Sequence, residues 1–217
     1  MEFERLLELV GNEPVFETAL LLAGKVNPEI VRLQITRWAK NGRVYQLRRG
    51  LYALAPPYQK VKPHPFLVAN RLQRASYVSL QSALAFYGLI PDIAQVTLSV
   101  TTGRPKRWET PLGVFEFRRV KLERLRGYRM IELRGGTQPI QQALVATPEK
   151  ALLDLVYLQP GGDLPTYLHE LRLQNLEQLD IGELERLAKL FDTPKLCRAV
   201  ETITRLAQDE AKEYETL

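Results

Sequence analysis

Basic and hydrogen-bonding side chains recur along one face of a predicted helix near the N-terminus. A stripe of Val31, Ile35 and Trp38 predicts its buried side, because apolar residues three and four apart share one face of a helix. The opposite face carries Arg32, Thr36, Arg37 and Lys40. Arginine binds guanine through two hydrogen bonds, and Arg and Lys both neutralise phosphates. The spacing predicts a DNA-reading face, although charges on the solvent side of any amphipathic helix give the same pattern.

A second group of basic residues surrounds the predicted hairpin that follows this helix. β-forming residues occupy 44–47 and 51–54, and Gly50 permits the positive φ of a tight turn. The basic residues expected around the tip are Arg43, Arg48 and Arg49. A hairpin in this place can reach the phosphate backbone or the minor groove. Together, helix and hairpin favour DNA binding over a merely solvated surface.

Two shorter helices are predicted before the basic helix. Phe3, Leu6 and Val10 form an apolar stripe that predicts a helix over 2–10. Pro14 suits the first turn of a second helix, which Gly24 can end. The buried face expected for this second helix comprises Phe16, Ala19, Leu20 and Ala23.

The order of these elements is that of a winged helix-turn-helix. A short turn at 25–26 leads to Asn27, a good N-cap, and to Pro28, a good first residue for the third helix. In this module the third helix enters the major groove and the hairpin is the wing. We therefore assign residues 1–55 to a DNA-binding domain and expect Asn27 to lie among its DNA-contacting residues.

The charge of the chain is unevenly distributed. The 217 residues carry a formal net charge of +5. Residues 25–134 contain 21 Lys and Arg but 6 Asp and Glu, whereas the segments before and after them are net acidic. A basic block of this size is the electrostatic footprint of a polyanion partner, although charge blocks also serve to solvate a surface. The acidic last third, which repels DNA, is better suited to solvent or to a protein partner.

The remainder of the chain predicts a second, larger α+β domain. Four prolines in 55–65 indicate a semi-rigid linker over 56–65, so the second domain covers 66–217. Strands are predicted at 77–78, 96–101, 114–117, 130–133 and 143–146. Helices are predicted at 66–74 and 79–88, and again after Thr147, Leu164, Asp180 and Thr193. Short connections between the strands favour a small, mostly antiparallel sheet followed by a helical subdomain.

The second domain also contains a candidate nucleic-acid surface. The segment 102–108 is expected to be a loop between strands, and it joins three positive charges to an indole that can stack on a base. The candidate residues are Arg104, Lys106, Arg107, Trp108, Arg118 and Arg119. A solvated hairpin loop and a charged sheet edge that resists aggregation are the alternatives.

Three stretches of the sequence together carry a family resemblance. The first is the segment 42–53, Gly-Arg-Val-Tyr-Gln-Leu-Arg-Arg-Gly-Leu-Tyr-Ala, whose general pattern is common. The second is Ser-Leu-Gln-Ser-Ala-Leu at 79–84, followed by Tyr-Gly-Leu at 87–89. The third is Thr-Pro-Glu-Lys-Ala-Leu-Leu-Asp-Leu at 147–155. With these stretches the chain resembles, to about residue 160, the AbiEi family, the antitoxins of type IV abortive-infection toxin–antitoxin systems, many of which have histidine in place of Tyr87.

The resemblance implies an antitoxin that also represses its own operon. Members of the family bind inverted repeats in their promoter through the N-terminal domain, and we expect this chain to act as a monomer or dimer on DNA. Their C-terminal domain neutralises a nucleotidyltransferase-like toxin, directly or through its target, and its basic face can assist DNA binding. By analogy, the operator contacts here are Arg32, Arg37, Lys40, Arg48 and Arg49. The alternative is a winged-helix regulator whose second domain senses a ligand or dimerises, without a toxin.

Several other classes of function are disfavoured by the sequence. Pro91-Asp92 and Glu116 faintly resemble nuclease carboxylates, but Arg118 occupies the position where such sites need lysine. No phosphate-binding glycine loop or nucleophile motif is present, so we expect no enzyme, cofactor or metal site. A single cysteine, no signal peptide and no long apolar run favour a cytoplasmic protein that does not enter membranes.

The charged residues of 147–155 have a simpler structural interpretation. Asp154 lies four residues after Lys150, so the two can pair along one helix. Glu149 near the helix N-terminus is stabilised by the helix dipole. We favour these structural roles over contact with a toxin.

Overall fold

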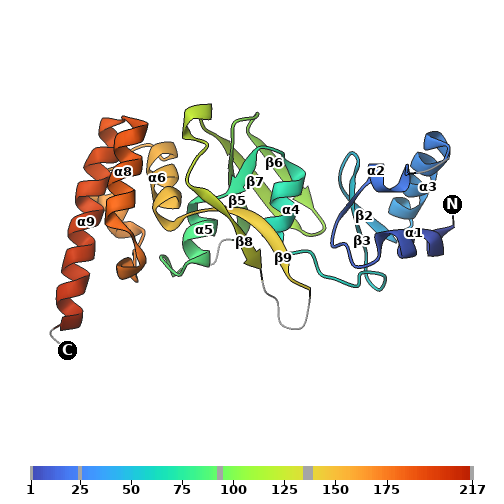
Figure 1. Cartoon of the computed structure of the whole chain (residues 1–217), viewed down its shortest axis with the longest axis horizontal. Helices are drawn as coiled ribbons and strands as arrows, with labels where there is room; N and C mark the ends of the chain where they lie inside the picture. Colours follow the sequence, from blue (N-terminus) through green and yellow to red (C-terminus); the bar gives the residue numbers. More distant parts are fainter. Residues whose placement is uncertain (1, 24–25, 92–94, 134–138, 216–217) are drawn as a thin grey trace.

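The computed structural model describes residues 2–23, 26–91, 95–133 and 139–215 and has a mixed α+β architecture (Figure 1). The N-terminal unit consists of α1 (Phe3–Val10), β1 (Phe16–Glu17), α2 (Thr18–Leu21), α3 (Pro28–Lys40), β2 (Val44–Arg48) and β3 (Leu51–Leu54). It lies at one end of the molecule, with the larger sheet in the middle and α8 (Ile181–Phe191) and α9 (Pro194–Glu215) at the other end. Gly24, Lys25 and Asp92, which entered the sequence interpretation, lie outside the described residues.

The basic helix forms as its local sequence predicts. The side chain of Asn27 accepts hydrogen bonds from the backbone N–H groups of Glu29 and Ile30, so two donors that the first helical turn leaves unpaired are satisfied. Val31, Ile35 and Trp38 are buried against the N-terminal core. The N-cap and the apolar stripe are therefore confirmed.

The prediction of a second helix, from Pro14 to Gly24, is largely wrong. Phe16 and Glu17 form strand β1, which pairs antiparallel with β3, and only Thr18–Leu21 is helical. The buried side chains are Val15, Phe16 and Leu21, whereas Ala19, Leu20 and Ala23 are exposed. The apolar spacing suited a helix, but pairing with a strand 35 residues further along the chain determines the structure.

A three-stranded sheet in the order β1-β3-β2 separates two hydrophobic cores. Successive side chains of a strand face opposite sides of its sheet. Tyr52 and Leu54 therefore pack with α1 and α3, whereas Leu51 and Ala53 join the buried cluster of the larger sheet. The hairpin thus contributes to both cores, and its register shifts between Gln46 and Arg48.

The proline-rich segment that follows is packed against the larger unit. Val61 and Pro63 are buried. Gln141 accepts a hydrogen bond from the backbone N–H of His64 and donates one to the carbonyl of Lys62. These contacts with strand β9 hold the end of the segment in place.

The larger sheet is mixed, with strand order β6-β7-β5-β4-β9-β8. Its strands are β4 (Ser76–Val78), β5 (Val96–Thr101), β6 (Lys106–Thr110), β7 (Gly113–Arg119), β8 (Tyr128–Leu133) and β9 (Gln141–Ala146). Parallel pairs join β4 to β9 and β5 to β7, whereas the other neighbours are antiparallel. The predicted strands are present, but the segment 106–108, expected in a loop, belongs to edge strand β6. This insertion of β6 lets β7 return parallel to β5 without a helical crossover.

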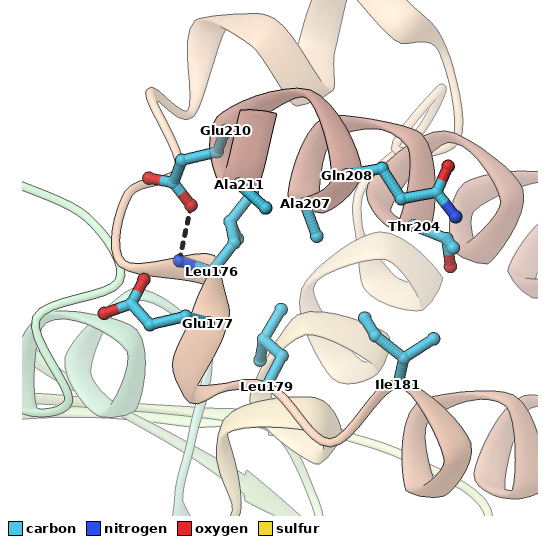
Figure 2. A pocket seen from close by; sticks show the side chains of 9 residues that line it. All are labelled: Leu176, Glu177, Leu179, Ile181, Thr204, Ala207, Gln208, Glu210 and Ala211. Atoms are coloured by element: carbon cyan, nitrogen blue, oxygen red, sulfur yellow. Dashed lines mark hydrogen bonds between the residues drawn. The ribbon is translucent and has the colours of Figure 1, made fainter. Parts of the chain in front are cut away.

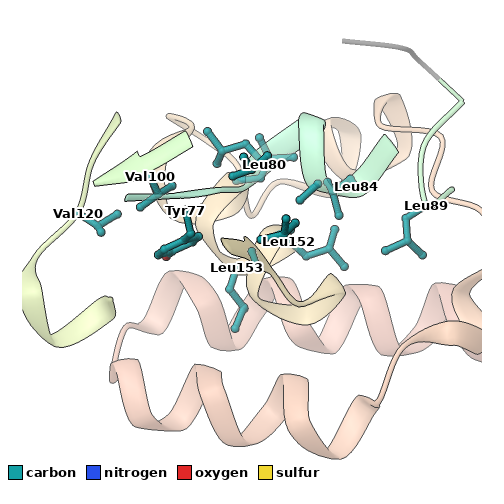
Figure 3. Close-up of a cluster of buried hydrophobic side chains, with 14 of the residues drawn as sticks. Tyr77, Leu80, Leu84, Leu89, Val100, Val120, Leu152 and Leu153 are labelled. Carbon is teal, nitrogen blue, oxygen red and sulfur yellow. The ribbon is translucent and has the colours of Figure 1, made fainter. Parts of the chain in front are cut away.

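Helices cover this sheet and extend the molecule away from the N-terminal unit (Figure 1). They are α4 (Pro65–Leu72), α5 (Leu80–Phe86), η1 (Leu122–Arg124), α6 (Pro148–Leu158), α7 (Pro165–Glu170), η2 (Leu176–Gln178), α8 (Ile181–Phe191) and α9 (Pro194–Glu215). Tyr77 from the sheet packs with Leu80, Leu84 and Leu152 in the buried cluster between sheet and helices (Figure 3). Caps at Thr147 and Asp180 confirm two predicted helix starts.

Helix α6 carries a buried ion pair within this core. The Lys150 ammonium contacts the Asp154 carboxylate, and both side chains are almost fully buried, which confirms their predicted pairing. The hydroxyls of Tyr77 and Ser79 donate to the other carboxylate oxygen at 2.9 and 2.8 Å. Burial lowers the pKa of Lys150, and the neighbouring Asp154 opposes this shift. These four side chains tie α6 to β4 and to the start of α5.

Candidate nucleic-acid interface

The exposed face of α3 brings together the side chains that the sequence placed there. Arg32, Thr36, Arg37 and Lys40 are all exposed. No described residue forms an ion pair with any of the three cations. The Thr36 hydroxyl donates to the backbone carbonyl of Arg32 at 2.8 Å, which leaves its oxygen able to accept a further bond. This face therefore presents three available cations and one hydroxyl on a single rigid helix.

Two apolar side chains on the same face were missed by the sequence interpretation. Leu33 is 60% exposed and Ile30 is 52% exposed. Leu33 lies opposite the Val31, Ile35 and Trp38 stripe, between Arg37 and Lys40 in the helical projection. In a major groove, aliphatic side chains at such positions contact the methyl group of thymine. The place of Leu33 opposite the buried stripe was the available signal.

Asn27 has a positional role at the start of this face. Its side-chain oxygen is engaged by the N–H groups of Glu29 and Ile30 at 2.9 and 3.4 Å. The cap fixes where α3 begins, and therefore how Arg32 and Arg37 are presented.

Arg48, predicted at the tip of the wing, makes its side-chain contacts with other residues of the protein. Its Nε and Nη2 donate to the carbonyl of Arg71 in α4 at 3.3 and 3.1 Å. The same guanidinium lies 3.7 Å from the carboxylate of Glu17, and the side chain is 22% exposed. Arg48 therefore fastens the hairpin to α4, while the neighbouring Arg49 is exposed.

Arg43 lies away from the tip, contrary to the expected clustering. It precedes β2, at the opposite end of the hairpin from Arg48 and Arg49. Its guanidinium carbon lies 4.9 Å from the centre of the Phe3 ring, a cation–π contact with α1. The arginines of the hairpin therefore occupy three different environments.

The candidate surface on β6 and β7 is divided between the two faces of the sheet. Residues paired across β6 and β7 share a face, so Lys106 and Trp108 lie on the side of Phe117 and Phe115. The ammonium of Lys106 lies 3.6 Å from the centre of the Trp108 ring. Arg119 falls on this face by alternation, whereas Arg107 and Arg118 fall on the other.

Most of the charge on the Arg107 face is already paired. Arg107 lies 3.2 Å from Glu109 and 3.8 Å from Glu116. Arg118 lies 3.0 Å from Glu116. Trp108 is half-buried, and its indole N–H has no hydrogen-bond partner among the described residues. Of the six candidates, Arg104, Lys106 and Arg119 remain as exposed cations without an ion pair to a described residue.

The junction between the two units holds a further arginine, Arg74, that the sequence interpretation omitted. Arg74, exposed at the end of α4, lies 3.6 Å from Glu17. A cavity of about 510 Å³ is bordered there by Arg48, Arg74 and the Gly50 turn. Arg48 and Arg74 are more than 20 residues apart in the sequence, so no local pattern predicts that they lie beside the same cavity.

Comparisons with known proteins leave the family resemblance as an expectation. Neither a protein-family model nor a curated protein sequence matches the chain. Within the described ranges, no helix has the length and apolar content needed to cross a bilayer. The same part of the chain contains no group of His, Cys, Asp and Glu side chains arranged to hold a metal ion.

Proposed function

We propose that this protein binds double-stranded DNA through a winged helix-turn-helix in its N-terminal unit, with α3 in the major groove. The observation that carries the proposal is the exposed face of α3. Its cations Arg32, Arg37 and Lys40 have no ion pair with a described residue, while the opposite side of the helix is anchored by a buried apolar stripe. Free cations on a rigid helix are what phosphate and base-edge contacts require.

The wing in this proposal contacts DNA through Arg49. Because Arg48 is bound to the carbonyl of Arg71, its guanidinium is committed to the junction with α4. Arg49 is exposed beside it and is available to a phosphate.

We further propose that the DNA is the promoter of the protein's own operon and that the protein is a type IV antitoxin. The support is the resemblance of three sequence stretches to the AbiEi antitoxins. Two of them meet in the core, because Ser79 donates to Asp154 from the third stretch at 2.8 Å. A regulator with a ligand-sensing second domain is the competing hypothesis.

The DNA proposal is tested by fluorescence anisotropy with the duplex immediately upstream of the gene. A scrambled duplex of the same composition is the comparison, across a series of salt concentrations. We expect tighter binding to the upstream duplex, with affinity falling steeply as salt rises. Arg205→Ala is the matched control variant, since Arg205 is exposed on α9, far from α3. Equal affinity for both duplexes would remove sequence-specific regulation.

The antitoxin proposal is tested by co-expression with the adjacent gene product. If that gene encodes a nucleotidyltransferase-like toxin, the protein should restore growth to cells that express it. An Arg37→Ala variant should retain this rescue while losing operator affinity, because α3 lies at the opposite end of the molecule from α8 and α9. An adjacent gene without a nucleotidyltransferase, or no rescue, favours the ligand-sensing regulator.

A further inference from the structure

Two cavities lie along α9 at the end of the molecule opposite to the N-terminal unit, one against η2 and the start of α8 and the other against α8. The first is a cavity of about 880 Å³ whose apolar lining includes Leu179, Ile181 and Ala207 (Figure 2). A second cavity, of about 410 Å³, is bordered by Ala188 and Val200. Thr204 lines both, so the two cavities adjoin at this residue. We call the two together the α8–α9 groove.

The geometry of the groove suits a helix. The residues of α9 that line it include Cys197, Val200, Thr204, Ala207 and Ala211, spaced alternately three and four apart. That spacing keeps one side of a helix facing a partner helix along its length. From Cys197 to Ala211 the lining spans roughly 21 Å at about 1.5 Å per residue, the length of a helix of about 14 residues. An apolar helical face can therefore lie along it, as in other helix-in-groove complexes.

The charged residues around the groove are mostly acidic, which favours a basic occupant. Four carboxylate residues and one lysine line it: Glu177, Glu185, Glu201, Glu210 and Lys189. Lys189 lies 3.7 Å from Glu185, so its charge is already balanced. Glu210 accepts the backbone N–H groups of Asn175 and Leu176. Glu177 and Glu201 are exposed and have no ion pair with a described residue.

This acidic border argues against a second copy of the chain. Two copies joined at the groove would face each other with the same excess of carboxylates, and like charges at an interface are unfavourable. An occupant with Lys or Arg beside its apolar stripe would pair with Glu177 and Glu201.

We propose that the α8–α9 groove docks a basic amphipathic helix of a partner protein. The proposal specifies the protein-partner half of the proposed function and is independent of the DNA-binding half. It places the partner at the acidic end of the molecule, away from α3.

The proposal is tested by selecting helices from a displayed peptide library against the full-length chain. Each peptide has about 16 residues, with Leu fixed at alternating spacings of three and four. The flanking positions are randomised among Lys, Glu, Gln and Ser. We expect the selected peptides to be enriched in Lys and depleted of Glu. Equal use of Lys and Glu, or no selected binder, would overturn the proposal.

Two variants locate the binding. Ala211→Arg introduces bulk and positive charge into the groove and should weaken a selected peptide by at least about tenfold, about 1.4 kcal/mol. Gln178→Arg adds the same side chain on η2 outside the lining and should bind as the wild type does. Unchanged affinity of Ala211→Arg would place the peptide elsewhere and overturn the proposal.

A charge reversal keeps the test decisive even if Ala211→Arg fails to fold. Glu177→Lys combined with Glu201→Lys changes only exposed side chains and should shift the selected peptides from Lys to Glu. Sedimentation velocity tests the alternative that a second copy of the chain occupies the groove. A dimer of the full chain that Ala211→Arg dissociates would support this alternative and overturn the proposal. Operator binding by Ala211→Arg should equal that of the wild type, so failure of the groove proposal and failure of DNA binding are separate results.

Discussion

Helix α3 and the β6–β7 strands carry similar basic sequences but leave their charges in different states. On α3, Arg32, Arg37 and Lys40 are exposed and form no ion pair with a described residue. On the sheet, Arg107 and Arg118 converge on Glu116. The sequence alone does not distinguish these two groups of cations. In the structure, a polyanion would have to compete with Glu116 for Arg107 and Arg118. Available charge, rather than total charge, therefore distinguishes a candidate interface.

The largest effect is expected on stability, at the buried carboxylate of Asp154, whose partners all lie within the protein. Asp154→Ala leaves the buried Lys150 ammonium without its partner and the hydroxyls of Tyr77 and Ser79 without their acceptor. We expect the free energy of unfolding to fall by about 3–5 kcal/mol, measured by urea denaturation.

The control replaces both members of the pair. Lys150→Met combined with Asp154→Leu removes both charges but still leaves the Tyr77 and Ser79 hydroxyls without their acceptor, so it should recover part of the lost stability. If Asp154→Ala were as stable as the wild type, the buried Lys150–Asp154 pair would contribute no more to stability than an exposed ion pair.

The next effect is on DNA affinity and compares the two basic regions directly. Arg37→Ala should weaken operator binding by about 1–3 kcal/mol if it contacts a base, with little change in the unfolding transition. Arg107→Ala removes an arginine that is already paired and should change operator affinity by less than about 0.5 kcal/mol. Fluorescence anisotropy on the upstream duplex measures both. If Arg107→Ala were the more damaging, the interface would belong on β6 and β7.

How much of this arrangement the sequence predicts depends on the range of the interactions. Asn27 and the stripe of α3 act within a few residues, so the helix and its exposed face could be predicted. Strand β1 could not, because Phe16 and Glu17 are held by partners in β3. Strand β6 was missed because Lys106-Arg107-Trp108 is too polar to look like a strand, and only its pairing with β7 places it in the sheet.

Arg48 illustrates the same limit for the candidate site. Its position in a hairpin turn made it a DNA contact by analogy, but the carbonyl of Arg71 lies 23 residues away in the sequence. No local pattern predicts such a bond, because it depends on how the hairpin docks on α4.

A smaller effect on stability distinguishes Arg48 from a neighbour with the same acidic partner. Arg48→Ala removes two hydrogen bonds to a backbone carbonyl from a mostly buried side chain, so we expect about 1–2 kcal/mol of lost stability. Arg74→Ala removes an 84% exposed side chain near the same Glu17 and should cost less than about 0.5 kcal/mol. Thermal unfolding compares the two. Equal, small losses would mean that Arg48 is available to DNA beside Arg49.

The smallest effect is expected at Arg49, the exposed arginine that we propose contacts a phosphate. Because one phosphate contact releases about one counterion, Arg49→Ala should lower the slope of log affinity against log salt by about 0.9. Affinity should fall alike on the upstream and scrambled duplexes, since a phosphate contact does not read sequence. The salt series also includes Arg48→Ala, whose slope should match that of the wild type because its guanidinium is bound to α4. A reduced slope for Arg48→Ala with an unchanged slope for Arg49→Ala would reverse the assignment of the wing contact.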